Sequence, residues 1–369
     1  MFTDLLLSEV SPKTSFAAVA CMKKIASICE AVETSKRSSP LDMALAIIDA
    51  LGGDEATLNQ VWIARADNSV PLADGIRTGA WSFRFTDSID RFEKPLIYFL
   101  RAEARGALSA AFDEATERGI FLNTAETIPS QWAKGVRPEI PLWLKAHRSC
   151  IPYDPASAQE ASAIVQGALQ ALYVDGLNGC CYLTLHEEGK DFLSKPPDAE
   201  TAFSGMYKVR SVTNGASLHQ VTLCGAGKAL HRVMQAADCL WEEWGVSSEV
   251  WSCPSYTLLA REGERMEQWN TLHPLEQNRR SRISTCLNDS HVPVIAVTDY
   301  GQHVAGQIGA YVDAPFTAIG ADSLEEKIRY PSVEWIIMFA LRALAEEGEL
   351  AFSVVGQALH RYELKLGAR

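Results

Sequence analysis

The sequence lacks the short motifs that mark several common enzyme classes. It has no Walker phosphate loop, no HExxH zinc pair and no GxSxG nucleophile turn. It has no CxxC pair, and Cys180 and Cys181 are adjacent, which is a poor spacing for zinc ligation. We see no internal repeat and no low-complexity segment. The sequence therefore gives no support for a nucleotide hydrolase, a zinc protease or a serine hydrolase.

Long apolar runs are also missing. The best candidate span, 335–344, is interrupted by Arg342, so we expect a buried amphipathic helix there and no membrane partner. Residues 1–4 lack the basic start of a signal peptide. The nine cysteines have mostly apolar neighbours, which is typical of reduced, buried thiols. We therefore expect a cytoplasmic protein.

Positive charge is scarce, because the formal net charge is −12. Such a surface repels phosphate backbones, so nucleic acid is not an expected partner. Arg279, Arg280 and Arg282 form a small basic cluster, which we interpret as a local patch. The 369 residues are 47% hydrophobic, which is enough for two domains with separate cores.

Apolar periodicity predicts alternating helices and strands over most of the chain. The expected helices lie at 5–52 with a break at 38–40, and at 101–117, 156–172, 228–244, 304–311 and 331–347, with another starting at 256–261. The expected strands lie at 61–64, 96–100, 181–185, 220–224, 248–252, 292–297 and 316–319. Residues 119–155 carry several prolines and are expected to be irregular. The alternation predicts an α/β fold with parallel sheets covered by helices on both faces.

Two local patterns allow more than one interpretation. Gly225-Ala226-Gly227 lies between a strand and a helix, as a dinucleotide-binding turn does, but the third glycine is replaced by Leu230. We favour a tight turn without a nucleotide. His186 and Glu187 follow a strand and could be either a catalytic pair or an exposed pair at the strand end. We favour the exposed strand end.

Longer residue strings in the second half are more specific. They are Cys224–Gly227, Glu249–Ser252, Leu258–Gly263, Trp269–Glu276, Leu287–Asp289 and Val297–Tyr300. Together they resemble the C-terminal domain of the bacterial homodimeric pyruvate dehydrogenase decarboxylase, a transketolase-like family. Upstream, Cys150–Ala156 resembles the end of the same family's middle domain, and Gly205–Lys208 resembles its linker. The similarity is ordered from about 148 to 350 and weak before 147.

The resemblance implies two doubly wound α/β domains. Residues 41–195 would form a shortened pyrimidine-binding-like domain, and 205–369 a transketolase C-terminal-like domain. Residues 1–40 would be an N-terminal helical segment. Independently of the resemblance, the loop Pro196-Pro197-Asp198 indicates a domain linker near there.

The resemblance also implies thiamine diphosphate with Mg as cofactor, bound between two kinds of domain. A diphosphate-binding domain needs a Gly-Asp-Gly turn and oxygen ligands for the metal, and neither is recognisable in this sequence. The expected partner is therefore a chain that carries this domain, in a heterodimer or heterotetramer acting on a small-molecule substrate.

The pyrimidine-binding domain of the family supplies a glutamate that hydrogen-bonds the cofactor's aminopyrimidine ring. By resemblance to the family's Glu-Leu-Gly-Ala-Gly segment, Glu103 is the candidate catalytic and cofactor-binding residue, and Gly106 lets the ring approach closely. Arg105 departs from this pattern, because the family has a small residue there. The alternative is that Glu103 is a solvated glutamate at a helix start.

Other departures concern the family's active-site loops. An acidic pair after the first strand would fall near Arg65-Ala66, and neither residue is acidic. The histidine-rich loop is replaced by residues 127–148, with His147 as its one histidine, and a late loop is cut to 323–325.

Two prominent segments outside these loops are expected to be structural. Trp269, Asn270 and His273 would serve the architecture of the C-terminal domain, and Asp299-Tyr300 would start a helix near an interface.

Two functions are consistent with the sequence. One is a subunit of a split thiamine-diphosphate enzyme for 2-oxo acid decarboxylation or two-carbon transfer. The other is a degenerate, non-catalytic paralogue that binds and stabilises or regulates a partner enzyme.

Overall fold

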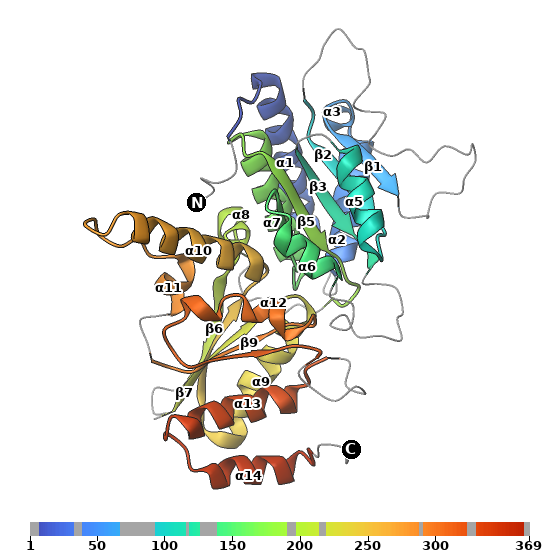
Figure 1. Ribbon diagram of the computed structural model, residues 1–369. Coiled ribbons are helices and arrows are strands. Elements are labelled where there is room, and N and C mark those ends of the chain that lie inside the picture. The colour runs from blue at the N-terminus through green and yellow to red at the C-terminus, as the bar shows by residue number, and fades with distance from the viewer. Residues whose placement is uncertain are drawn as a thin grey trace. The chain divides into compact units, whose positions relative to one another are not determined.

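The computed structural model describes residues 7–32, 39–66, 93–115, 118–125, 139–189, 197–213, 219–287, 291–322 and 330–364. The chain divides into two compact units. The first comprises Met1–Pro129 and Leu142–Phe203, and the second comprises Ser130–Pro141 and Ser204–Arg369. Each unit contains its own sheet and helices (Figure 1).

The first unit is built on a parallel sheet with strand order β1-β2-β3-β5-β4 among the described residues. The strands are β1 (Trp62–Ala66), β2 (Leu96–Leu100), β3 (Arg118–Asn123), β4 (Cys150–Tyr153) and β5 (Gly179–Thr184). All residues of β2 and β3 are buried, which explains why β2 reads as an unbroken apolar run.

Helices cover both faces of this sheet. The helices associated with the first unit are α1 (Pro12–Val32), α2 (Pro40–Gly53), α3 (Glu55–Leu58), α5 (Arg105–Glu114), α6 (Glu139–Ala146, with Leu142 onward in this unit), α7 (Ala158–Tyr173) and α8 (Ala199–Phe203). The crossovers through α5 and α7 run in opposite directions along the sheet, so right-handed connections put these helices on opposite faces. α1 and α2 pack with α7, whereas the ring of Phe112 in α5 makes a tilted contact with that of Trp143 in α6.

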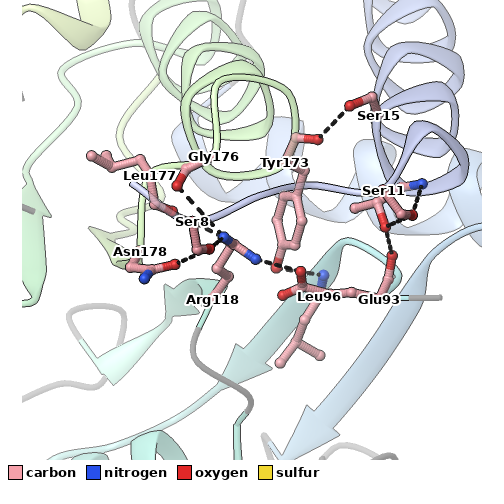
Figure 2. Close-up of polar contacts among 11 residues, drawn as sticks. Ser8, Ser11, Ser15, Glu93, Leu96, Arg118, Tyr173, Gly176, Leu177 and Asn178 are labelled. Carbon is pink, nitrogen blue, oxygen red and sulfur yellow. Dashed lines mark hydrogen bonds and ion pairs between the residues drawn. The ribbon is translucent and has the colours of Figure 1, made fainter. Parts of the chain in front are cut away.

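Arg118 ties the amino-terminal side of the first unit together (Figure 2). It opens β3, is 4% exposed, and donates to the carbonyl oxygens of Gly176 and Leu177, the latter at 3.1 Å. Its guanidinium also pairs with Glu93 and hydrogen-bonds the Ser8 hydroxyl. One buried cation thus joins the segment before α1, the start of β2 and the α7–β5 turn.

The second unit has a sheet of order β10-β9-β7-β8-β6 among the described residues. The strands are β6 (Tyr207–Val212), β7 (Gln220–Gly225), β8 (Ser247–Ser252), β9 (Val294–Val297) and β10 (Phe316–Ile319). β6 pairs antiparallel with β8, and the other pairings are parallel. Its helical segments are α9 (Lys228–Trp244), α10 (Tyr256–Leu272), α11 (Arg282–Leu287), α12 (Gln302–Gly306), η3 (Gly309–Tyr311), α13 (Val333–Glu346) and α14 (Phe352–Arg361).

The α/β fold class with two doubly wound units is confirmed, and most expected elements are present. The expectation that 119–155 is irregular is wrong, because β3, α6 and β4 lie there. The short run Ile120–Leu122 becomes a strand because β2 and β5 pair with it on both sides. The segment likened to a linker, Gly205–Lys208, enters β6 at Tyr207. No described helix is both long and apolar enough to cross a membrane.

Candidate functional site

Glu103 lies in the loop between β2 and α5, at the carboxyl end of the first unit's sheet. This is the edge at which open parallel sheets place their ligands. The Glu103 side chain is 53% exposed, and one carboxylate oxygen lies 3.9 Å from Nε of Arg101, which is itself exposed. The carboxylate is therefore accessible, and it can accept a hydrogen bond from a ligand that approaches this edge.

The helix after Glu103 begins with a bare, small-residue surface. Its N-cap, Ala104, makes no side-chain hydrogen bond to the helix, so no capping side chain covers the backbone N–H groups of Arg105 and Gly106 in the first turn. A Cβ atom added to Gly106 would meet nothing within 4 Å, and Ala107 and Ala110 are exposed beside it. Arg105, the departure from the family pattern, is exposed at the first helical position. A flat ring could lie on this surface without a steric conflict at Gly106.

Asn123, the last residue of β3, was missed by sequence reasoning. It is 1% exposed, and its side-chain amide hydrogen-bonds the backbone of Ala102, directly before Glu103. The polar pair Asn123-Thr124 after the run Ile120–Leu122 is the signal that could have indicated a strand end. The contact itself has no local sequence signature, because it joins residues 21 positions apart.

The loop after β4 is held by two buried polar side chains. His186 is fully buried, so the expectation of an exposed strand-end histidine is wrong, whereas Glu187 is exposed. The His186 ring donates from Nε2 to the carbonyl oxygen of Pro155 at 3.0 Å. From the other side, the carboxylate of buried Glu160 accepts the backbone N–H of Ala156. These contacts give His186 an anchoring role in this loop.

The end of β1, where the family's acidic pair would fall, carries a cation. Arg65 pairs in register with Phe99, its guanidinium carbon lies 5.8 Å from that ring, and Nη2 lies 3.9 Å from a carboxylate oxygen of Asp49. The described residues contain no cluster of three or more side chains suited to hold a metal ion. Ranges 67–92, 126–138 and 323–329, which include most of the altered loops, lie outside the described residues.

In the second unit, Trp269, Asn270 and His273 lie at the carboxyl end of α10 and stabilise the turn that follows this helix. His273 stacks on Trp269 with ring centroids 4.3 Å apart, and the guanidinium carbon of Arg279 lies 3.8 Å from the Trp269 ring centroid. The Asn270 side chain exchanges two hydrogen bonds with the backbone of Arg279, at 2.7 and 3.0 Å. These contacts give the Trp269, Asn270 and His273 side chains a structural role in holding this turn.

The remaining arginines of the basic cluster also have intramolecular contacts. Arg280 donates to the carbonyl oxygen of Ser284, and Arg282 donates to that of Met206. The cluster is therefore part of the framework of the second unit.

The glycine turn and Asp299 also have structural partners. A Cβ atom on Gly225 would lie 2.8 Å from the Cα atom of Leu230, so the turn before α9 requires glycine for close packing. Asp299, at the end of β9, pairs with Arg232, whose Nε also donates to the carbonyl oxygen of Pro331 at 2.7 Å. These contacts join α9, β9 and the start of α13.

Sequence comparison relates the chain to known enzyme components. Residues 205–324 match the family model described as "Transketolase-like TK C-terminal domain". The "Pyruvate dehydrogenase E1 component" of Cupriavidus necator is 35% identical over 225 residues, which are 58% of this chain and 25% of the relative. The component of the same name from Escherichia coli K12 is 34% identical over 227 residues, with the same coverages. The chain thus spans about a quarter of the length of the curated relatives it matches.

Structure comparison gives the same fold. A transketolase from Leishmania mexicana superposes with a TM-score of 0.54 at 16% identity, covering 85% of this chain and 46% of that one. A chain described as "Split gene transketolase, inactive beta4 tetramer" gives a TM-score of 0.51 at 14% identity and covers 84% of this chain and 99% of that one. The resemblance to the C-terminal half of the pyruvate dehydrogenase decarboxylase and to transketolases is confirmed.

Proposed function

We propose that this chain is one subunit of a split thiamine-diphosphate-dependent enzyme, working with a partner chain that carries the diphosphate- and Mg-binding domain. The observation that carries the proposal is the share of a related chain that the fold of this chain covers. The fold of this chain accounts for 99% of a chain from a split-gene transketolase. This match supports one half of a two-part enzyme.

The residues of the first unit fit the pyrimidine half of the cofactor and not the diphosphate half. An accessible carboxylate at Glu103 lies next to the open surface at Gly106. In contrast, the described residues offer no cluster of metal ligands, so those ligands are assigned to the partner. When bound, thiamine diphosphate would supply the nucleophilic chemistry toward a substrate carbonyl.

In this proposal, Glu103 accepts a hydrogen bond from a ring nitrogen of the aminopyrimidine and holds a proton there. Gly106 allows the ring to approach the helix. The reaction is decarboxylation of a 2-oxo acid or transfer of a two-carbon acyl or ketol unit, in a heterodimer or heterotetramer. All nine cysteines lie in the described residues and none of them forms a disulfide, which is consistent with a cytoplasmic setting.

A second function is favoured by Arg65, which occupies the strand end where the family has acidic residues. The chain would then be a non-catalytic paralogue that binds and stabilises or regulates a partner enzyme. Under this reading, Glu103 is a solvated glutamate at a helix start.

The test is co-expression with a partner that bears a Gly-Asp-Gly thiamine domain, followed by calorimetric titration of the complex with thiamine diphosphate and Mg. Glu103→Gln should weaken binding roughly 10- to 100-fold, because a charge-assisted hydrogen bond is lost. It should lower turnover at least about 100-fold, the usual contribution of a positioned proton-transfer group.

Glu55→Gln is the matched control. Glu55 is an exposed glutamate at the start of a different helix, α3, so its replacement should change neither quantity. Absence of binding by the wild-type complex, or equal binding and turnover for Glu103→Gln and wild type, would contradict the catalytic proposal and favour the paralogue.

A further inference from the structure

Asn123 fastens the loop that presents Glu103. Its Oδ1 accepts the N–H of Ala102 at 2.9 Å, and its Nδ2 donates to the carbonyl oxygen of Ala102 at 3.0 Å. Ala102 is 1% exposed, as is Asn123, and it immediately precedes Glu103. We infer that Asn123 is the positioning residue for Glu103, an inference that rests on the proposed function of that carboxylate.

The orientation of the Asn123 amide follows from its partners. On the oxygen side, the backbone N–H groups of Ala102 and Ala125 donate to Oδ1 at 2.9 and 3.1 Å. On the nitrogen side, the carbonyl oxygen of Ala102 and the Tyr182 hydroxyl accept at 3.0 and 2.8 Å. Both hydrogens of the amide are therefore used. A carboxylate could not donate to the carbonyl, and a hydroxyl could not reach both groups of one residue.

The loop needs such a fastening because its own helix does not supply one. Ala104, the N-cap of α5, provides no side-chain hydrogen bond, so the direction in which the chain leaves β2 is not set by a cap. The β2–β3 ladder pairs Leu100 with Asn123 and so ends two residues before Ala102. The Asn123 side chain extends the attachment of β2 to β3 beyond that ladder, up to the residue before the carboxylate.

Tyr182 supports the amide from the neighbouring strand. It lies on β5, pairs in register with Phe121 of β3, and its hydroxyl takes the second hydrogen of Nδ2. The position of Glu103 thus depends on three adjacent strands, β2, β3 and β5. A catalytic group that must meet a ligand held partly by another chain requires such pre-organisation.

The first experiment uses the free full-length chain and amide hydrogen–deuterium exchange. Asn123→Leu keeps the branching and the number of non-hydrogen atoms of the side chain but removes its hydrogen bonds to Ala102, so exchange in residues 102–105 should rise at least about tenfold. Thr124→Val is the matched control, because it removes a neighbouring buried hydroxyl that donates to Leu100. It should change the same amides less than about threefold. Equal exchange in Asn123→Leu and wild type, or an equal rise along all of β2 and β3, would overturn the positioning role.

The second experiment uses the complex with the partner, thiamine diphosphate and Mg. Asn123→Leu should lower kcat at least about tenfold with KM nearly unchanged, because the substrate does not contact Asn123. In a Glu103→Gln background the same substitution should have no further effect on kcat, since Asn123 acts through Glu103. Additive losses in the double variant would overturn the inference. Failure of the wild-type complex to bind the cofactor would instead refute the proposed function. The exchange experiment on the free chain does not depend on that function, so the two failures can be told apart.

Discussion

Replacing Arg118 with methionine tests the cluster at the amino-terminal side of the first unit. The substitution keeps the apolar stem of the side chain and removes the guanidinium. It leaves the Glu93 carboxylate, the Ser8 hydroxyl and the carbonyl oxygens of Gly176 and Leu177 without their common donor.

The magnitude follows from the burial of the partners. Removing one member of a buried ion pair costs about 3–5 kcal/mol, because the remaining charge stays desolvated. Arg118 is 4% exposed, but the Glu93 side chain is 27% exposed, so water can solvate part of the stranded carboxylate. We therefore expect the free energy of unfolding to fall by about 3 kcal/mol, the lower end of that range.

The assay is urea unfolding of the full-length chain, monitored by fluorescence and by circular dichroism to separate the transitions of the two units. Arg342→Met is the matched control, because Arg342 pairs with Glu346 at 2.8 Å with both side chains at least half exposed. That loss should cost less than about 0.5 kcal/mol. A double-mutant cycle of Arg118→Met with Glu93→Gln should give a coupling above about 1 kcal/mol. Equal costs for the two arginine variants, or strictly additive losses in the cycle, would refute the reasoning.

Three further predictions concern other sites. The hydrogen bond from Lys24 holds the pKa of the Asp54 carboxyl below its ordinary value of 3.8. The stability that this hydrogen bond provides is therefore present at neutral pH and is lost as the pH falls through the lowered pKa. Asp54→Asn should flatten the pH dependence of the free energy of unfolding below pH 3.8. Burial raises the pKa of Cys21 to about 12, so a thiol reagent at about pH 8 should modify Cys21 only after urea is added. Labelling of Cys21 in the folded chain, detected by mass spectrometry, would contradict this prediction. A Cβ atom on Gly320 would lie 2.2 Å from a backbone nitrogen, so Gly320→Ala should lower the free energy of unfolding by about 2 kcal/mol or more. A Cβ atom on Gly356 would meet nothing within 4 Å, so Gly356→Ala should stabilise helix α14 by about 0.5–1 kcal/mol. Equal melting temperatures for the two variants would be inconsistent with this packing.

The predictability of each element depended on how local its signal was. β2 and α9 could be located closely because their patterns are self-contained: β2 is a run of apolar residues, and α9 lies between Gly227 and Gly245. β3 was missed because its apolar run, Ile120–Leu122, is only three residues long and its partners are far away in the sequence.

The candidate site divides in the same way. Glu103 could be proposed from sequence because a strand, a carboxylate and small residues follow one another within a few positions. Asn123 could not, because its importance comes from a contact with Ala102 on another strand. The burial of His186 was also unpredictable, since it depends on the loop that contains Pro155.

The packing of α1 against α7 has a consequence for biosynthesis. The buried face of α1, formed by Ala17, Cys21 and Ile25, is completed by a helix that is translated more than a hundred residues later, and the hydroxyl of Ser15 donates to the carbonyl oxygen of Tyr173 across 158 positions. During synthesis at about 5–20 residues per second, the part of this face that α7 covers stays exposed for roughly ten seconds or longer, although α2 and α3 follow α1 sooner. A nascent chain that exposes an apolar helix for this time is a natural substrate for a ribosome-associated chaperone, and expression yield should depend on such assistance more than the stability of the finished fold would indicate.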